Sequence, residues 1–248
     1  MNTNKKKIVI TGAGSGIGRA SAQLFLKKGY EVALIGRNLS KLKETSQNNS
    51  EALIIKCDVS NKKEVKTAFS KVEAVFGRLD VLFNNAGIFH KSGTIDQISF
   101  DDWSESINTN LTGTFLCSRE AFKIMKKQEP QGGRIINNGS VSAYVPRPEA
   151  IGYTASKHGV TGITKTLSLD GRKFNIACSQ IDIGNAHTEI TSAISSGAKQ
   201  ANGSIQGEPT FDVSQAAKAI LHIAEVPAEA NIQFMTLMAT KMPFIGRG

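Results

Sequence analysis

Short apolar runs alternate with longer helical patterns along the chain, and this alternation limits the possible folds more than any other feature. The strands are expected at residues 7–11, 31–36, 52–56, 81–84, 133–137, 175–181 and 232–238. The helices are expected at residues 16–28, 38–48, 61–76, 100–127, 153–173 and 213–224. The strands are almost continuously apolar, as strands covered on both faces must be. The chain is therefore predicted to be α/β, with a doubly wound parallel sheet of seven strands and helices on both faces.

Local signals mark several helix ends. Asn38 and Asn61 stand where their side chains can cap the second and third helices, and Gly29 closes the first. The long helix at residues 100–127 is expected to place its apolar side chains on one face. Those side chains are Ile107, Leu111, Phe115, Phe122 and Met125.

The 248 residues are expected to form one domain, 1–248, because no linker, repeat or low-complexity tract divides them. The least regular segment, residues 188–211, is rich in Ser, Gly, Gln and Asn. Weakly structured segments of that length in compact domains usually serve binding or closure. We therefore predict that residues 188–211 form a substrate-binding loop.

Composition excludes several classes of protein. The chain has no run of about 18 apolar residues, so no membrane span is expected. Cys57, Cys117 and Cys178 are far apart and the four histidines are dispersed, which indicates reduced thiols in a cytoplasmic protein and no metal site. The formal charge of +9 favours anionic partners but does not separate nucleic acid from a phosphorylated cofactor. Because no basic segment is interleaved with aromatic residues, nucleic acid is not expected as a partner.

A glycine-rich turn, Thr11 to Gly18, lies between the first strand and its helix. Glycines let the backbone approach a pyrophosphate, whose charge the first N–H groups of the helix stabilise. The spacing departs from Gly-x-Gly-x-x-Gly, and a simple tight turn is the alternative, which four glycines at alternate positions weaken. The turn predicts a Rossmann fold in which these residues bind a dinucleotide: Gly12, Gly14, Ser15, Gly16, Ile17 and Gly18.

The end of the second strand indicates which dinucleotide binds. An acidic residue about 20 positions after the turn would accept the 2′-hydroxyl of NAD, whereas an arginine suits the 2′-phosphate of NADP. The second strand ends at Arg37 with no carboxylate in reach, and Lys41 and Arg19 add positive charge nearby. We therefore predict NADP, with NAD the less favoured cofactor and a solvated Arg37 the alternative interpretation.

Tyr153 and Lys157 stand four residues apart in a predicted helix, which places both side chains on one face. A neighbouring cation favours the phenolate, so the pKa of Tyr153 is expected to fall from about 10 toward neutrality. Ser140 follows the fifth strand at the sheet edge where ligands of open α/β sheets bind, and Asn110 lies inside the long helix. A Tyr-x-x-x-Lys pattern alone is a weak signal. Together with Ser140 and Asn110, it indicates a catalytic site.

Together these motifs resemble the short-chain dehydrogenase/reductase family over essentially the whole chain. The glycine turn matches the family's cofactor motif, and Asp58 matches the acid that contacts the adenine. Asn84 to Gly87 match the motif after the fourth strand. The residues that match the catalytic tetrad are Asn110, Ser140, Tyr153 and Lys157.

The resemblance implies a role for each of these residues. Tyr153 would exchange a proton with the substrate oxygen while hydride passes to or from the nicotinamide. Lys157 would bind the ribose hydroxyls and lower the pKa of the tyrosine, Ser140 would hydrogen-bond the substrate oxygen, and Asn110 would hold a water. The further cofactor contacts that it implies are Val59, Asn85, Ala86, Gly87, Gly184 and Thr188. The implied function is an oxidoreductase that transfers a hydride between NADP(H) and a small alcohol or carbonyl compound.

The chain departs from the family pattern after the sixth strand. Gly184 and Thr188 keep their places, but Ile183 replaces the usual proline, so the turn loses a fixed φ. Asp182 is expected to hydrogen-bond the backbone of this turn. The tail from Lys241 lacks a glycine pair common in the family, which weakens assignment to the 3-oxoacyl-carrier-protein reductases without excluding it.

Three segments are expected to set the substrate selectivity, and two helices are expected to set the assembly. Residues 144–151, the stretch after Ile88 and residues 188–211 would contact the substrate. Within them Arg147 and His90 are expected to be a solvated arginine and an incidental loop histidine. A non-catalytic nicotinamide-binding regulator is an alternative, which the intact tetrad opposes. We expect a homodimer or homotetramer formed through the two long helices, where small residues allow close approach: Ala155, Gly159 and Gly162.

Overall fold

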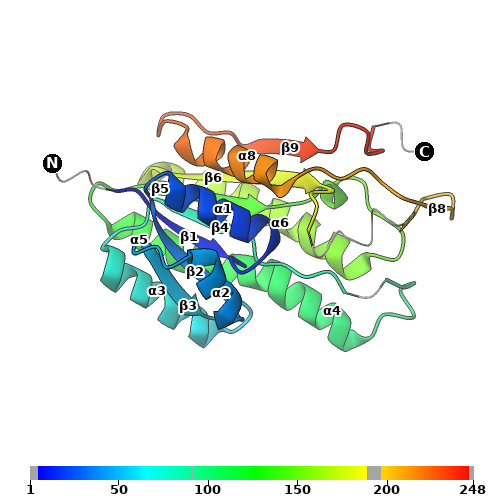
Figure 1. Cartoon of the computed structure of the whole chain (residues 1–248), viewed down its shortest axis with the longest axis horizontal. Helices are drawn as coiled ribbons and strands as arrows, with labels where there is room; N and C mark the ends of the chain where they lie inside the picture. Colours follow the sequence, from blue (N-terminus) through cyan, green and yellow to red (C-terminus); the bar gives the residue numbers. More distant parts are fainter. Residues whose placement is uncertain (1–4, 91, 189–196, 246–248) are drawn as a thin grey trace.

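The computed structural model describes residues 5–90, 92–188 and 197–245 of the chain. Their main feature is one seven-stranded sheet in the order β3-β2-β1-β4-β5-β6-β9, in which every neighbouring pair is parallel (Figure 1). The strands are β1 (Lys7–Thr11), β2 (Glu31–Gly36), β3 (Ala52–Lys56), β4 (Val81–Asn84), β5 (Gly133–Asn138), β6 (Ile176–Gly184) and β9 (Phe234–Met238). The predicted doubly wound parallel sheet is confirmed.

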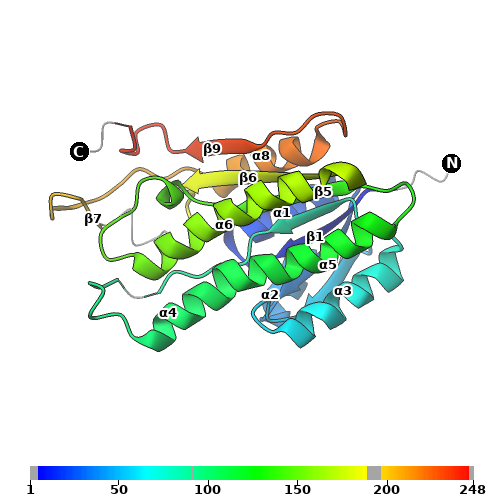
Figure 2. The ribbon, with the colours of Figure 1, turned by 180° about the vertical axis from the view of Figure 1, so that it is seen from behind.

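Helices cover both faces of this sheet. They are α1 (Gly16–Lys27), α2 (Leu39–Ser46), α3 (Lys62–Phe76), α4 (Phe100–Ile107), α5 (Gly113–Lys127), α6 (Ile151–Asp170) and α8 (Val213–Glu225). On the face toward the viewer in Figure 1, α1, α2 and α8 pack on side chains such as Ile8 and Ile10. On the other face, seen in Figure 2, α3 and α5 pack on Val9 and its neighbours. Successive side chains of β1 therefore point to opposite faces of the sheet and pack into two separate cores.

Several helix ends agree with the sequence signals. The Asn38 side chain accepts a hydrogen bond from the backbone N–H of Lys41 at 3.0 Å, at the start of α2. Asn61 accepts from the N–H groups of Lys63 and Glu64 at the start of α3. After α1, Gly29 has a φ of +81°, a left-handed conformation that favours glycine. The predicted caps are confirmed.

The long helix is not uniform. Between α4 and α5 the chain forms a π-helical turn, Asn108–Thr112, so the helical period is interrupted. The expected single apolar face is therefore wrong: Met125 is buried, whereas the Phe115 side chain is 48% exposed. The buried residues of α5 include Leu116 and Cys117, which face the sheet.

Strand β6 extends three residues beyond its predicted end. Asp182, Ile183 and Gly184 continue the strand because they pair in parallel with Thr236 to Met238 of β9. The isoleucine that replaces the family's proline supplies a backbone N–H, which a proline would lack. The sheet therefore reaches further toward the ligand-binding edge at β6 than the sequence indicates.

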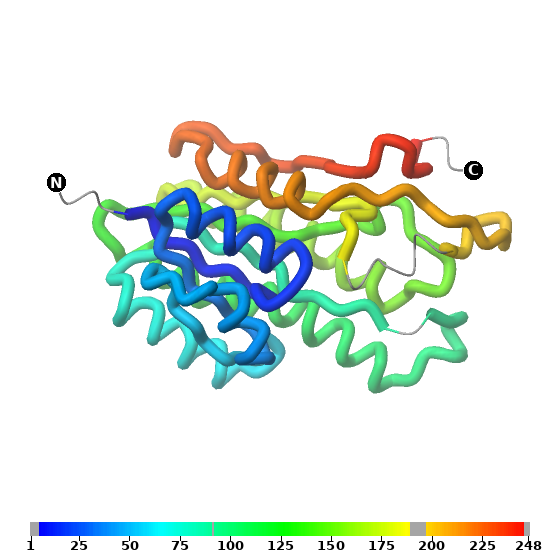
Figure 3. The backbone as a smooth tube through the Cα atoms, viewed as in Figure 1, coloured from blue at the N-terminus to red at the C-terminus, as the bar shows by residue number. Residues whose placement is uncertain are grey.

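The predicted substrate-binding loop contains a small antiparallel pair, β7 (Ala198–Lys199) and β8 (Ile205–Gln206). Residues 189–196 of this loop lie outside the described residues. Figure 3 shows the described part, in gold, at the end of the molecule toward which the sheet strands run. Parallel strands present their carboxyl ends at one edge, so this loop lies where a ligand would bind.

Candidate active site

A cleft of about 320 Å³ lies at the carboxyl ends of β1 to β6. It joins the glycine turn at one end to helix α6 at the other. Most of the predicted site residues line it: Gly12, Gly14, Ser15, Gly16, Ile17, Arg37, Asp58, Val59, Asn85, Ala86, Gly87, Tyr153, Lys157 and Thr188. Four predicted site residues are not among the residues that line the cleft: Gly18, Asn110, Ser140 and Gly184.

The glycine turn is packed against the end of β4. A Cβ atom at Gly18 would lie 2.2 Å from the carbonyl oxygen of Gly12, and Gly12 itself has a φ of +64°. The Thr11 hydroxyl accepts hydrogen bonds from the backbone N–H groups of Asn85 and Ala86, both at 3.0 Å. These contacts fix the turn before any ligand binds.

The start of helix α1 lacks negative charge of its own. Among the described residues, the Ser15 side chain makes no capping hydrogen bond, and the first turn of α1 contains no acidic residue. The positive end of the helix dipole and its first N–H groups therefore face the cleft uncompensated. A dinucleotide pyrophosphate fits this end of the cleft, because it supplies the missing charge to a turn that only glycines can form.

Lys157 is held in place at the other end of the cleft. Its ammonium donates a hydrogen bond to the carbonyl oxygen of Asn138 at 2.7 Å and lies 5.5 Å from the centre of the Tyr153 ring. Burial lowers the pKa of Lys157 to about 8, and the negative charge of Asp182 opposes this shift. The lysine is thus preorganised beside the tyrosine without an ion pair in contact.

The prediction that the pKa of Tyr153 falls is wrong. Burial raises the pKa of the phenol above its usual value, a hydrogen bond with Ser140 lowers it, and the charge of Asp182 raises it. Loss of hydration is the largest cause of this rise, and the Lys157 ammonium lies 5.5 Å from the ring centre. The tyrosine is therefore held in its neutral, proton-donating form.

Asn110 lies in the π-helical turn and is almost fully buried. Its amide donates to the carbonyl oxygen of Ile88 at 3.0 Å and to the Ser156 hydroxyl at 3.2 Å, and it accepts from the Ile88 N–H at 2.8 Å. These bonds join the segment after β4 to α6. The water-holding role implied for Asn110 stays a prediction.

The prediction that Asp182 hydrogen-bonds the turn after β6 is wrong, because its carboxylate contacts the turn after β5 instead. Its carboxylate accepts a hydrogen bond from the N–H of Ser140 at 2.9 Å, and it also accepts from the Tyr144 hydroxyl at 3.1 Å. The second contact has no local signal in the sequence, because Tyr144 lies 38 residues away.

The interpretation of Arg147 as a solvated side chain is wrong. Its guanidinium donates two hydrogen bonds, at 2.6 and 2.5 Å, to the buried carboxylate of Glu208 and a third, at 3.3 Å, to Asn185. Glu208 is 4% exposed and also accepts from Gln200. This ion pair fastens the predicted substrate-binding loop to the segment that follows Ser140.

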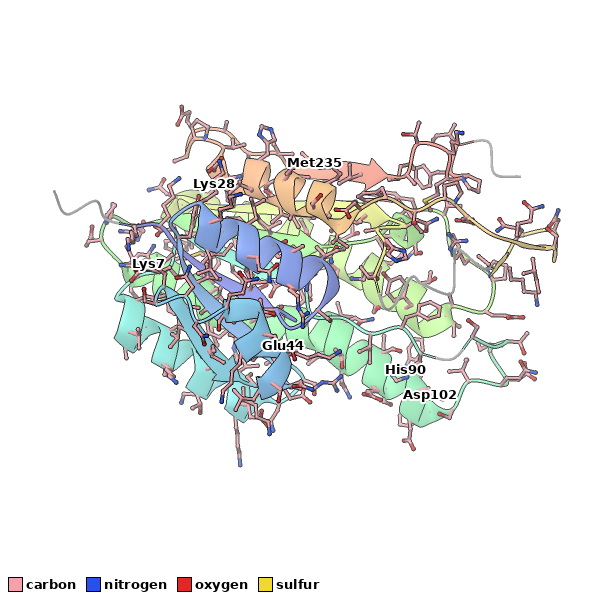
Figure 4. The ribbon with its side chains drawn as sticks, in the orientation of Figure 1. Lys7, Lys28, Glu44, His90, Asp102 and Met235 are labelled. Carbon is pink, nitrogen blue, oxygen red and sulfur yellow. The ribbon has the colours of Figure 1, made fainter. Side chains whose placement is uncertain are left out.

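His90, which was expected to be an incidental loop histidine, lies close to two acidic side chains. Its Nε2 atom lies 3.3 Å from a carboxylate oxygen of Glu105, and its Nδ1 atom lies 3.7 Å from Asp102 (Figure 4). The adjacent Phe89 ring packs edge-on against Tyr153, with the ring centres 5.3 Å apart. The segment after β4 therefore forms one side of the space in front of the tyrosine.

Several residues that line the cleft were missed by the sequence analysis. They are Ile88, Thr109, Asn138, Gly139, Asn185 and Ala186. Most of them stand just after the carboxyl ends of β4, β5 and β6. Their position after a buried strand was the available signal, because ligands of parallel sheets bind at that edge.

Other predicted properties concern thiols, metals and membranes. Cys57, Cys117 and Cys178 are buried and unpaired, and burial raises the pKa of Cys57 and of Cys178 to about 12. In the described ranges we find no group of three or more His, Cys, Asp or Glu residues arranged around a possible metal ion. Nor does any helix within them have the length and apolar character needed to cross a bilayer.

Residues 6–199 match the family described as short chain dehydrogenase. A 3beta-hydroxysteroid dehydrogenase of Mediterraneibacter gnavus is 38% identical over 192 residues, which cover 76% of this chain and 68% of that protein. An uncharacterized oxidoreductase of Staphylococcus aureus, MW2403, is 31% identical over 234 residues, or 94% of this chain and 96% of the relative.

Two solved structures are similar over nearly their whole length. A 3-ketoacyl-(acyl-carrier-protein) reductase of Brucella melitensis complexed with NADH has a TM-score of 0.86 at 23% identity, and covers 96% of this chain and 99% of its own. An actinorhodin polyketide ketoreductase variant with NADPH has a TM-score of 0.83 at 26% identity, with 96% and 98% coverage.

Proposed function

The chain belongs to the short-chain dehydrogenase family, and on that premise we propose that it transfers a hydride between NADP(H) and an alcohol or carbonyl compound. The observation that carries the proposal is the shared cleft. Tyr153 and Lys157 line the same cleft as the glycine turn, so a proton donor stands at one end of a site suited to a dinucleotide.

Each part of the chain has a separate task in this reaction. When bound, the nicotinamide supplies the hydride chemistry. The glycine turn and the start of α1 bind the pyrophosphate, and Lys157 donates hydrogen bonds to the ribose. Tyr153 gives its proton to the substrate oxygen in reduction and takes it back in oxidation, while the Ser140 hydroxyl orients that oxygen.

The proposal is tested with NADPH oxidation and a Tyr153→Phe variant. Wild-type protein is expected to oxidise NADPH with at least one member of a panel of ketones and aldehydes graded in size and charge. Tyr153→Phe removes only the hydroxyl, so turnover should fall by about 10²- to 10⁴-fold while the Kd for NADPH stays within about twofold. A variant that keeps its turnover would refute the role of Tyr153, and binding of NADPH without any turnover would support the regulator instead.

The preference for NADP over NAD rests on Arg37. This side chain is 57% exposed and lines the cleft at the end of β2, where Lys41 adds a second cation. Its nearest carboxylate oxygen, on Glu105, is 3.8 Å away, a distance that leaves the guanidinium able to turn to a phosphate. Titration of both cofactors tests this preference, and tight NAD⁺ binding without NADP⁺ binding would contradict it.

The substrate is proposed to be a bulky apolar alcohol or ketone. Phe89 and Tyr144, which are 41% and 50% exposed, border the space in front of Tyr153 and Ser140. A further apolar cluster lies beyond them and contains Val141, Ala239, Met242, Phe211, Met238 and Phe244. The relative named as a 3beta-hydroxysteroid dehydrogenase supports this substrate class. Comparing a 3-ketosteroid with an acetoacetyl thioester would separate it from the 3-oxoacyl-carrier-protein reductase alternative.

A homodimer or homotetramer is proposed from the groove between α5 and α6. This groove, of about 620 Å³, is lined by Phe115, Phe122, Ile163 and Leu167 with a basic rim. A Cβ atom at Gly162 would meet nothing within 4 Å, so this position of α6 is free to contact a second subunit. Gly159 instead packs against Leu111 of its own chain, so it does not fit the predicted subunit contact. Light scattering measures the assembly, and a monomer at all concentrations would contradict it.

A further inference from the structure

A carboxylate that no step of the proposed reaction uses lies directly behind Ser140. Asp182 is on β6, two residues before Gly184, and is completely buried. A buried carboxylate is costly unless it is fully hydrogen-bonded or paired with a cation. The partners of the Asp182 carboxylate therefore indicate what this buried charge does.

The carboxylate of Asp182 gathers three donors from different elements. One oxygen accepts from the Ser140 N–H at 2.9 Å and from the Gln180 side chain at 2.8 Å, and the other accepts from the Tyr144 hydroxyl at 3.1 Å. A Cβ atom at position 139 would lie 2.0 Å from the first oxygen, so Gly139 is what admits the carboxylate. The chain is thus shaped around this group.

Gln180 connects Asp182 to the helix that carries the tyrosine and the lysine. The Gln180 amide donates to the Thr161 hydroxyl at 3.0 Å and accepts from the Thr164 hydroxyl at 2.9 Å. Both threonines lie on α6, one to three turns after Tyr153 and Lys157. A continuous set of hydrogen bonds therefore runs from α6 through β6 to the turn that contains Ser140.

We propose that Asp182 is a positioning residue for the reaction, which fixes Ser140 through its main chain and holds the Tyr144 ring as a wall of the substrate site. The inference rests on the proposed function. Tyr144 needs such an anchor, because its ring is half exposed and its hydroxyl makes its hydrogen bond with Asp182. A ring held by a buried charge keeps one orientation when an apolar substrate packs on it.

The charge of Asp182 also acts on the groups around it. The titratable groups that face it are Lys157 and Tyr153 from α6 and Tyr144 from the turn after β5. Its partner on β9, Thr236, carries no charge, and neither does Asn138 at the end of β5. Burial raises the pKa of both tyrosines, and the carboxylate raises it further and favours the ammonium form of Lys157. Its removal should therefore make Tyr153 more acidic.

Phenolate absorbance tests this effect without any substrate. The chain has three tyrosines, and the third, Tyr30, has a pKa of about 12 that burial, Glu225 and Asp80 raise. In a background that carries both Tyr30→Phe and Tyr144→Phe, Tyr153 is the one phenol left to titrate. Adding Asp182→Asn should lower that midpoint by about one pH unit, because an ionised neighbour has become neutral. Asp170→Asn, an equal change of charge at the exposed end of α6, should leave it unchanged.

Turnover tests the positioning role. Using NADPH and the best carbonyl compound of the panel, Asp182→Asn should raise KM severalfold and lower kcat, whereas Asp170→Asn should match the wild type. Tyr144→Phe should raise KM and leave kcat within about twofold, because its effect is on binding. In the Tyr144→Phe background, Asp182→Asn should add little to KM, because both changes release the same ring.

The outcomes separate this inference from the proposed function. A wild type without turnover refutes the function, while the phenolate titration still decides the effect of Asp182. An active wild type whose Asp182→Asn variant matches Asp170→Asn in midpoint and KM overturns the positioning role. If Asp182→Asn does not fold, Tyr144→Phe alone decides, and an unchanged KM in that variant overturns the role.

Discussion

Replacing Arg147 by methionine is expected to lower the free energy of unfolding by about 3 kcal/mol, because it removes the guanidinium from a buried carboxylate. The change leaves Glu208 in place at 4% exposure while its two short hydrogen bonds from Arg147 are lost. Methionine keeps most of the length of the side chain, so packing changes little. The loss then reports the ion pair itself.

The magnitude follows from the ionisation of Glu208. Burial raises the pKa of Glu208, but hydrogen bonds from Arg147, Gln200 and Asn185 outweigh burial and lower it from 4.5 to about 2. At about 1.4 kcal/mol per unit, this difference corresponds to about 3 kcal/mol of stability, of which Arg147 supplies the largest share among the three donors. Breaking buried ion pairs costs about 3–5 kcal/mol, which agrees.

The pH dependence has a definite sign. Because the pKa of Glu208 is lower in the folded chain than in the unfolded one, its contribution is complete above about pH 4.5 and is lost as the pH falls through about 2. Less than half of the contribution should remain at pH 3. The difference between the wild type and Arg147→Met should therefore shrink steadily below pH 4.5.

Urea unfolding followed by circular dichroism at pH 7, 5, 4 and 3 measures these differences. Lys5→Met is a matched control, because Lys5 pairs with Glu51 at 2.8 Å but the two side chains are 44% and 29% exposed. An exposed pair should contribute less than about 1 kcal/mol. The reasoning fails if Arg147→Met costs no more than Lys5→Met, or if its cost is the same at pH 3 as at pH 7.

Three further substitutions test other parts of the molecule. Arg37→Ser should weaken NADP⁺ binding by about 10- to 100-fold and leave NAD⁺ binding within about twofold, measured by calorimetry; equal losses for both cofactors would contradict the assignment. Gly18→Ala should lower the Tm and prevent NADPH binding, because the added Cβ would lie 2.2 Å from the Gly12 carbonyl oxygen; an unchanged melting curve speaks against this packing. Gly162→Ala meets nothing within 4 Å and should stabilise the chain by about 0.5–1 kcal/mol, while light scattering shows whether the methyl group weakens self-association.

The sheet and its helices could be predicted because their signals are local. The apolar run of β1 and the capping side chains of Asn38 and Asn61 act over a few residues, and the structure places each as expected. The end of β6 was placed three residues too early, since its last residues form a strand by pairing with β9. Pairing of that kind joins segments more than 50 residues apart, and neither segment reveals it alone.

The candidate site divides in the same way. The glycine turn, Tyr153 and Lys157 are set by motifs within single segments, and the fold brings them to one cleft. The pKa of Tyr153 was misjudged because desolvation depends on everything packed around the phenol. The pair of Arg147 and Glu208 was missed because 61 residues separate two loops that only the folded chain brings together.

The π-helical turn, Asn108–Thr112, has a consequence for how this chain can change in length. A π-turn holds one residue more than the α-helix around it needs, so removing a residue there would restore an unbroken helix. The helices on either side would keep their relative orientation, because the wide turn takes up the extra residue within one turn, so Leu116 and Cys117 would still face the sheet. Asn110 would lose its contact with Ile88 in the same step. A deletion in this turn should therefore leave the core packed but disrupt the candidate site, so insertions and deletions should be confined to the loops around residues 92–99 and 197–211.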